Sequence, residues 1–351
     1  MPAALIHSPK RRSLCVGLAA LPLACPPKFV AASEEDASDP LPSWRDTAPK
    51  RTILQFVQRT TDPRSPDFIA PVDRIATFDN DGTLWVEKPL PNEVYFMLAR
   101  VKELAAADPS LAERQPFRAA LAGDAAYFHE AGAKAVAELF VATHSGSSQE
   151  DFAAQVRAFL GKEVHPKLRR PFTSLAYRPM LELLAWLRAN GFQTWICSGG
   201  DTDFMRVFAH EVYGIPAQFV IGSEVKRETR RDGGLLAVWR LPAVDAINDK
   251  DGKPVGIDRR IGKRPLIAGG NVLSGGDIAM LEYSRGRKGP SLQLLVNHDD
   301  AEREYAYAEK DDASLSAARA RDFTVVSIRN DWKTVLAALE QPAREGTVSL
   351  A

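Results

Sequence analysis

The chain has 351 residues, with 45 basic and 45 acidic side chains, so its formal net charge is zero. This balance argues against a nucleic-acid-binding protein and against a strongly basic membrane-binding surface, because both need an excess of positive charge. The length suits one α/β domain with an insertion, or two small domains.

The first 32 residues resemble a secretory signal peptide. The basic group Lys10–Arg12 precedes a short apolar stretch, 14–24, and Val30–Ala32 offers small residues for cleavage. The paired arginines suit a Sec or a twin-arginine signal, and Cys25 is a weaker sign of lipoprotein anchoring. We therefore expect a periplasmic or secreted protein with no stable membrane insertion after cleavage. A cytoplasmic protein with an apolar start is the alternative.

Only Cys197 would remain after such cleavage, so no internal disulfide is expected and the core alone must stabilise the mature chain. Cys197 lies in the apolar run 192–197, which predicts a packed thiol. Residues 33–49 are rich in Ser, Asp, Glu and Pro and predict a mobile leader. A short helix is expected at 52–60, so residues 33–70 would form a leader and N-terminal helix.

The first strand signal is followed by two acidic residues. The mainly apolar segment Arg74–Phe78 predicts a buried strand that ends at Asp79. Alternate residues of an extended chain share a face, so the carboxylates of Asp79 and Asp81 could converge. Two such anions repel each other unless a cation lies between them, and Mg²⁺, which prefers oxygen ligands, is the first candidate. Because Gly82 permits a sharp turn, a solvated loop is the competing interpretation.

A block of helices is predicted next. Apolar residues recur with a period near 3.6 in four segments, 93–107, 117–122, 125–143 and 149–159. Because no strand pattern occurs in this block, residues 92–172 predict a helical cap inserted into a domain of residues 71–345.

Strands and helices alternate in the rest of the chain. Strands are predicted at 192–197, 218–221, 265–268, 292–296 and 323–328. Helices are predicted at 180–189, 203–213 and 255–261 and from Asp277, with polar turns and hairpins at 224–246. This alternation predicts an α/β fold with a Rossmann-like parallel sheet covered on both faces.

Polar groups occur where several of these strands end, which is the edge where parallel α/β sheets bind ligands. Ser198–Gly200 follows one strand, and Asn271–Asp277 follows another. Lys253 precedes a predicted helix. Each has a plain structural alternative, because Ser198–Gly200 could be a turn, Asp277 a helix cap and Lys253 a surface lysine. Lys263 competes with Lys253 for a role at the site.

Together these segments resemble the four motifs of the haloacid dehalogenase superfamily of phosphatases, particularly its phosphoserine-phosphatase-like branch with a helical C1-type cap. The matching segments, in motif order, are Asp79–Leu84, Trp195–Gly200, Gly252–Ile257 and Gly270–Asp277. The resemblance covers the chain from about Val72 to the last predicted strand. The fourth motif departs from the usual pattern, because Asn271 replaces the expected aspartate and Asp277 lies slightly farther along.

The resemblance implies a role for each of these residues. Asp79 would be the nucleophile that becomes an aspartyl phosphate, and Asp81 would be the general acid and base. Phosphate would be bound by Ser198, Gly199 and Lys253. The Mg²⁺ ligands would be Asp79, Asp277 and the backbone carbonyl of Asp81, with Asn271 giving a neutral oxygen or a supporting hydrogen bond. The departure at Asn271 implies weaker metal affinity.

Dehalogenases of this superfamily lack the second carboxylate, so Asp81 implies phosphate ester hydrolysis. The expected function is a Mg²⁺-dependent phosphatase acting on a small phosphorylated metabolite. A phosphotransferase on the same scaffold and a weakened protein that binds phosphate esters are the alternatives.

Two further groups of residues carry weaker expectations. Glu87, Lys88 and Arg178 are minor candidates for contacts with the substrate. For His298–Asp300, a loop that caps the next helix is favoured over a metal site.

Overall fold

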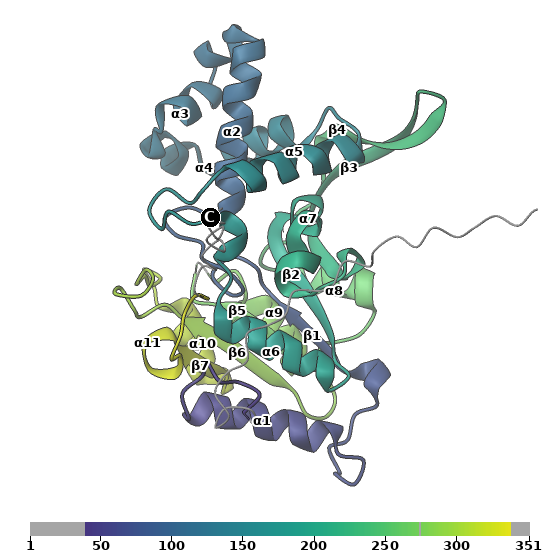
Figure 1. Ribbon diagram of the computed structural model, residues 1–351, viewed down its shortest axis with the longest axis vertical. Coiled ribbons are helices and arrows are strands. Elements are labelled where there is room, and N and C mark those ends of the chain that lie inside the picture. The colour runs from purple at the N-terminus through teal and green to yellow at the C-terminus, as the bar shows by residue number, and fades with distance from the viewer. Residues whose placement is uncertain (1–38, 274, 338–351) are drawn as a thin grey trace, which may run out of the picture. The chain divides into compact units, whose positions relative to one another are not determined.

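The computed structural model describes residues 39–273 and 275–337. The predicted signal peptide, residues 1–32, lies outside these ranges, as do the first residues of the predicted leader. A seven-stranded sheet in the order β4-β3-β2-β1-β5-β6-β7 forms the centre of the described chain (Figure 1). The strands are β1 Ile75–Phe78, β2 Gln193–Asp201, β3 Val220–Asp232, β4 Leu235–Ala246, β5 Ile267–Asn271, β6 Leu292–Asn297 and β7 Thr324–Ser327.

All neighbouring strands pair in parallel except β3 and β4, which are antiparallel. Every residue of β1 is buried, as expected for a central strand covered on both faces. Ala76 and Phe78 belong to one hydrophobic cluster and Ile75 to another, because alternate side chains point to opposite faces. The predicted α/β fold with a Rossmann-like core is confirmed.

The helices around this sheet are α1 Ala48–Thr61, α6 Arg178–Ala189, α7 Thr202–Tyr213, α8 Gly252–Ile261, α9 Ile278–Arg285, α10 Ala313–Arg321 and α11 Ile328–Asp331. The described chain also contains the 3₁₀ turns η2 Pro71–Asp73, η3 Pro109–Glu113, η4 Phe172–Ser174 and η5 Ala217–Phe219. Within the described ranges, no helix is both long and apolar enough to cross a membrane.

The cap consists of α2 Asn92–Ala107, α3 Phe117–Ala122, α4 Ala125–His144 and α5 Gln149–Lys162, all between β1 and α6 (Figure 1). These helices have a small core of their own, formed by Met97, Val101, Phe117, Ala120 and Leu139. Helix α4 is interrupted at Gly132, where φ is 65° and ψ is −154°. Such angles suit glycine, so the two halves of α4 point in different directions.

The β3–β4 hairpin is longer than the sequence indicates. The sequence predicts a strand at 218–221 and separate polar turns and hairpins at 224–246, whereas β3 runs through 13 residues and pairs with β4 along most of its length. The hairpin leaves the core and runs to the cap, where β4 packs on α4 and α5 (Figure 1). The outer part of β3 is polar and exposed, whereas β4 begins with the exposed apolar residues Leu235 and Leu236, so neither strand shows the buried hydrophobic pattern of a core strand there.

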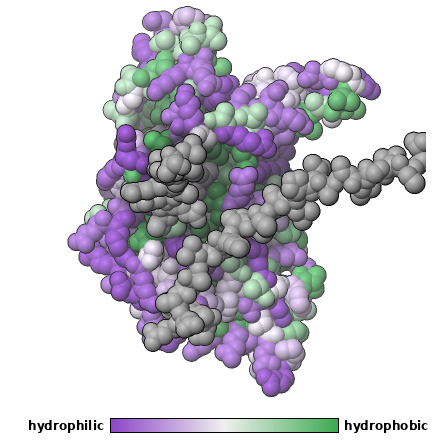
Figure 2. Space-filling model, in the orientation of Figure 1, coloured by the Kyte–Doolittle hydropathy of each residue, from purple (hydrophilic) through white to green (hydrophobic). Residues whose placement is uncertain are grey.

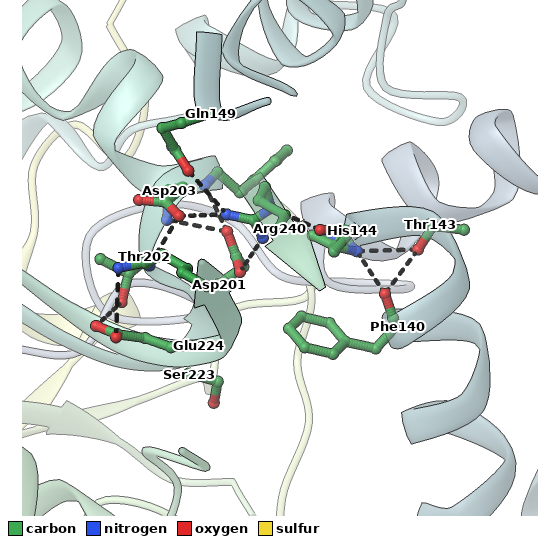
Figure 3. Close-up of polar contacts among 12 residues, drawn as sticks. Phe140, Thr143, His144, Gln149, Asp201, Thr202, Asp203, Ser223, Glu224 and Arg240 are labelled. Carbon is green, nitrogen blue, oxygen red and sulfur yellow. Dashed lines mark hydrogen bonds and ion pairs between the residues drawn. The ribbon is translucent and has the colours of Figure 1, made fainter. Parts of the chain in front are cut away.

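A buried arginine on β4 joins the hairpin to the cap and core (Figure 3). Arg240 donates to Asp201 at 2.8 Å and to Asp203, and its Nε donates to the carbonyl of His144. We name Arg240, Asp201 and Asp203 the Arg240 cluster. The guanidinium carbon lies 3.9 Å from the centre of the Phe152 ring. Asp201 and Asp203 stand at the start of α7 and His144 ends α4, so one side chain connects three elements.

The prediction of a mobile leader is wrong for residues 39–49. Leu41 and Trp44 are fully buried in the main core. The Trp44 indole packs edge-on against Trp332, with 6.0 Å between ring centroids, and donates to the carbonyl of Pro179. Polar composition suggested disorder, but two buried apolar side chains and the hydrogen bonds of Ser43 to Glu182 hold this segment against distant residues.

Candidate active site

Asp79 and Asp81 lie in a tight turn at the end of β1. The backbone N–H of Asp79 still pairs with the Gly269 carbonyl of β5, at 2.9 Å. The chain then turns back, with the Gly82 N–H donating to the Trp85 carbonyl at 2.8 Å. Gly82 has a φ of 68°, and a Cβ there would lie 2.0 Å from Asn271 Nδ2. Both the backbone angle and the lack of space require glycine at this position.

Lys253, in the first turn of α8, is buried between two carboxylates. Its ammonium donates to Asp79 Oδ1 at 2.7 Å and also to Asp277 Oδ1. We name Lys253, Asp79 and Asp277 the Lys253 cluster. Burial alone would lower the pKa of Lys253, but the charges of Asp277 and Asp79 outweigh it and raise the pKa. Lys253 therefore stays charged, and its one positive charge faces two carboxylates.

The carboxyl group of Asp277 is buried and has more than one partner. Its Oδ2 accepts from the backbone N–H of Asn271 at 2.9 Å. Burial raises the pKa of Asp277, and the charge of Asp79 adds to this effect. Asp277 also stands just before α9, at the N-cap position, but its side chain makes no capping hydrogen bond. The competing interpretation as a helix cap therefore has no support in the side-chain contacts.

The carboxyl group of Asp81 also lies near other acidic side chains. Its Oδ1 accepts from the Trp85 indole N–H at 2.9 Å. Burial, followed by the charges of Asp79 and Glu87, raises the pKa of Asp81 to about 8. A carboxyl group with such a pKa carries a proton at neutral pH, which is what a general acid requires.

Asn271, the residue that departs from the motif, contacts the turn directly. Its Nδ2 donates to the backbone carbonyl of Asp81 at 2.6 Å. The resemblance assigns that carbonyl to the metal ion, so the amide competes for the same lone pairs. Of the two roles expected for Asn271, the structure displays a hydrogen bond.

Ser198 and Gly199 do not form a separate turn after β2, because the strand continues to Asp201. Pairing with β3 shifts register between Cys197 and Asp201. Asn248 Nδ2 donates to the Ser198 carbonyl at 2.9 Å, and Ser223 Oγ donates to the Gly199 carbonyl at 2.7 Å. These bonds fix the irregular end of β2 at the pocket.

The seven site residues from the sequence line one pocket of about 550 Å³. They are Asp79, Asp81, Ser198, Gly199, Lys253, Asn271 and Asp277. Lys263 lies elsewhere and pairs with Asp73 at 2.6 Å. Of the weaker candidates, Glu87 lines the pocket, whereas Lys88 sits over the Tyr307 ring and Arg178 pairs with Glu182.

The segment His298–Asp300 does not converge on one ligand site. The imidazole Nε2 of His298 lies 2.8 Å from the Gly82 carbonyl and must donate to it, because a carbonyl only accepts. Asp299 accepts from Ser327 and Asp300 from Arg303. His298 therefore supports the turn that carries Asp79 and Asp81 by a hydrogen bond to its backbone, a role that no local sequence pattern reveals.

Glu93, in the first turn of α2, also lines the pocket and was not found from the sequence. Its carboxylate accepts from the Asp201 N–H at 3.0 Å and lies 3.1 Å from His144 Nε2. Acidic residues are common in first helical turns, so Glu93 carried no distinct signal.

The donors at the site fit Mg²⁺. Asp79, Asp277 and the Asp81 carbonyl offer hard oxygen atoms, and the buried carboxylates outnumber the one ammonium beside them. Within the described part of the chain, no group of three or more His, Cys, Asp or Glu side chains could hold a metal ion. Mg²⁺ does not need such a group, because one or two carboxylates, water and substrate phosphate commonly complete its octahedron.

Comparison with solved structures finds similar folds at low sequence identity. A conserved protein of unknown function from Anaerococcus prevotii is 16% identical with a TM-score of 0.50, covering 79% of this chain and 91% of its own. A protein of unknown function from Bordetella pertussis is 17% identical with a TM-score of 0.49, covering 72% and 97%. A phosphoserine phosphohydrolase-like protein from Francisella tularensis is 14% identical with a TM-score of 0.37, covering 72% and 94%.

A comparison with curated proteins gave no match. The pattern of one protein family, haloacid dehalogenase-like hydrolase, matches residues 76–265. The match is longer than half of the chain, begins in β1 and ends just before β5, and so includes Asp79, Ser198 and Lys253. The chain belongs to the haloacid dehalogenase-like hydrolase family.

Proposed function

We propose that this protein is a Mg²⁺-dependent phosphatase that hydrolyses small organic phosphate monoesters through an aspartyl phosphate on Asp79. The observation that supports it most is the convergence of Asp79, Asp81, Lys253 and Asp277 on one pocket from separate strand and helix ends. Phosphoryl transfer needs an in-line nucleophile, positive charge near the phosphate oxygens and a proton for the leaving oxygen. Each of these requirements has a residue at the site.

The reaction would proceed in two steps. A carboxylate oxygen of Asp79 attacks phosphorus as the bond to the ester oxygen breaks, and Asp81 gives its proton to that oxygen. Asp81 then takes a proton from a water molecule that attacks the aspartyl phosphate, which releases inorganic phosphate and restores Asp79. Lys253 and the Ser198 hydroxyl would hold phosphate oxygens during both steps.

Asp79, Asp277 and the Asp81 carbonyl would hold the metal ion, with Asn271 beside them. When bound, Mg²⁺ supplies positive charge that stabilises the charge developing on the phosphate oxygens. We further propose, from the N-terminal sequence pattern, that the enzyme works in the periplasm or outside the cell.

The test is turnover of p-nitrophenyl phosphate with Mg²⁺ by the wild type and by Asp79→Asn. We expect the variant to lose at least about 10³-fold in kcat, because the nucleophile is gone. Asp73→Asn is the matched control, since Asp73 is half exposed and pairs with Lys263 away from the pocket. Equal rates in the wild type and Asp79→Asn would exclude the proposal.

The hydrogen bond from Asn271 to the Asp81 carbonyl favours one second candidate, a protein that binds phosphate esters without hydrolysing them. If Asn271 keeps the metal ion out, the wild type will bind inorganic phosphate but release no p-nitrophenol. Asn271→Asp, which restores the usual residue of the motif, would then gain turnover.

A further inference from the structure

The pocket beside Asp79 has a second, apolar wall that the reaction itself does not use. The cap supplies six of its lining residues, Val94, Met97, Ala133, Val136, Ala137 and Phe140. Val244 and Ile247, from the end of β4 and just after it, add to this wall. Figure 2 shows hydrophobic surface in the centre of the view, between the cap and the core.

The second half of α4 presents one face to the pocket. Its lining residues, Ala133, Val136, Ala137 and Phe140, follow the spacing i, i+3, i+4 and i+7, which places them on a single stripe of a helix. The break at Gly132 immediately precedes this stripe. Such a stripe normally packs against protein, yet Val136 remains 46% exposed, and Ile247, which lines the same pocket after β4, is 66% exposed. Apolar side chains are therefore left uncovered inside a pocket.

The charges of the pocket do not suit a second anionic group on the substrate. Among its described lining residues the only cations are Lys253, held by Asp79 and Asp277, and the exposed Lys250. Glu87 and Glu93 are acidic and already have partners, the Tyr307 hydroxyl and the Asp201 N–H. A carboxylate on the leaving group would meet these acids with no buried cation to pair with.

We propose that the substrate is a phosphate monoester of an apolar alcohol, whose hydrocarbon body lies against α2 and α4 while its phosphate reaches Asp79. This inference rests on the proposed phosphatase function and adds the class of leaving group. The pocket volume of about 550 Å³ is within the range of roughly 300–1,000 Å³ typical of sites that enclose drug-sized ligands. The phosphate alone would fill only a small part of it.

Binding of alkylphosphonates to the full chain tests this directly, because their carbon–phosphorus bond cannot be hydrolysed by the proposed reaction. We expect the affinity measured by titration calorimetry to rise about fourfold for each methylene from ethyl- to hexylphosphonate, since each buried CH₂ is removed from water. An affinity that does not change along the series would overturn the inference.

Two matched valine variants locate the effect. Val136→Asp places a charge on the apolar stripe and should reduce the gain per methylene to less than twofold. Val164→Asp changes a valine of similar exposure, 43%, that does not line the pocket, and should keep the fourfold gain. An equal gain in both variants would show that the hydrocarbon binds elsewhere.

Turnover separates failure of the inference from failure of the function. We expect kcat/KM for hexyl phosphate to exceed that for O-phosphoserine by at least about 100-fold, because four or more methylenes of about fourfold each are involved. If p-nitrophenyl phosphate is hydrolysed but kcat/KM is higher for O-phosphoserine than for hexyl phosphate, the proposed function stands and the inference fails. If no ester is hydrolysed, the proposed function fails and the substrate class fails with it.

Discussion

The Lys253 cluster and the Arg240 cluster are both built from one buried cation between two aspartates, yet their surroundings differ. Asp203 receives further hydrogen bonds from Arg206 and Arg227, at 3.0 and 2.9 Å. Among the described residues, Asp79 and Asp277 share the single cation Lys253, Asp277 accepts one further bond from the Asn271 N–H, and both line a pocket. A carboxylate saturated by arginines can only hold the structure together, whereas a carboxylate short of donors can accept a metal ion or a phosphoryl group.

The largest expected effect concerns the Arg240 cluster. Arg240→Met should lower the free energy of unfolding by about 3–5 kcal/mol, because it leaves Asp201 and Asp203 buried without their shared partner. Urea denaturation followed by circular dichroism measures this. Arg230→Met is the control, since Arg230 on β3 is half exposed and should change stability by less than about 0.5 kcal/mol. Equal losses of stability in Arg240→Met and Arg230→Met would mean that burial of the Arg240 cluster does not contribute to stability.

Removing the cation of the Lys253 cluster should reduce activity more than stability. Lys253→Met should lower kcat with p-nitrophenyl phosphate by about 10²–10³-fold, because a preorganised charge next to the phosphate is lost. We expect its loss of stability to be smaller than that of Arg240→Met, since water in the pocket can solvate Asp79 and Asp277. Lys263→Met, on an exposed lysine, should match the wild type in both assays. A greater stability loss in Lys253→Met than in Arg240→Met would reverse the comparison.

Metal binding should stabilise one cluster and not the other. At free Mg²⁺ 100 times its Kd, the free energy of unfolding should rise by about 2.7 kcal/mol. Asp277→Asn should lose most of this increase, and Asp73→Asn should keep it. Thermal unfolding at matched ionic strength with and without chelator measures the effect. An increase of the same size in NaCl alone would show that screening, not a site, is responsible.

The smallest effect is expected at Cys197, which is buried on β2 with its sulfur 3.8 Å from the Lys253 carbonyl. Burial raises the pKa of its thiol to about 12, and the nearby Lys253 charge lowers it only in part. At pH 8 the thiolate fraction is therefore about one in 10⁴. Iodoacetamide should leave the Cys197 peptide unlabelled in the native protein and label it in urea, as peptide mass mapping would detect. Rapid labelling of Cys197 in the native protein would mean that the Lys253 charge lowers the pKa of the thiol more than burial raises it.

The sequence was sufficient for the parallel strands of the sheet and for the residues on their ends, but not for the antiparallel strand β4. Asp79, Ser198 and Asp277 each follow or lie near an apolar strand, so local pattern and known sheet geometry place them at one edge. Lys253 and Lys263 could not be separated in this way, because both stand in polar segments. Only the tertiary structure decides which of the two reaches Asp79.

Residues that act across long sequence separations could not be predicted. Arg240 and His144 are 96 positions apart, and His298 and Gly82 are 216 apart. Arg240 lies in the largely apolar strand β4, but an arginine is usually solvated, and no local pattern indicates the two aspartates, 37 and 39 positions away, that pair with it. For the same reason, the anchoring of residues 39–49 by Trp44 was missed, because its partners are far away in the sequence.

The close approach of Gly82 to Asn271 limits what this family can change at the turn. A homologue with a shorter side chain at position 271 would still not accept alanine at position 82, because Glu87 Oε1 would lie 2.6 Å from the added Cβ and the φ of 68° would still be strained. Among related sequences, position 82 should therefore stay glycine even where the residue at position 271 varies.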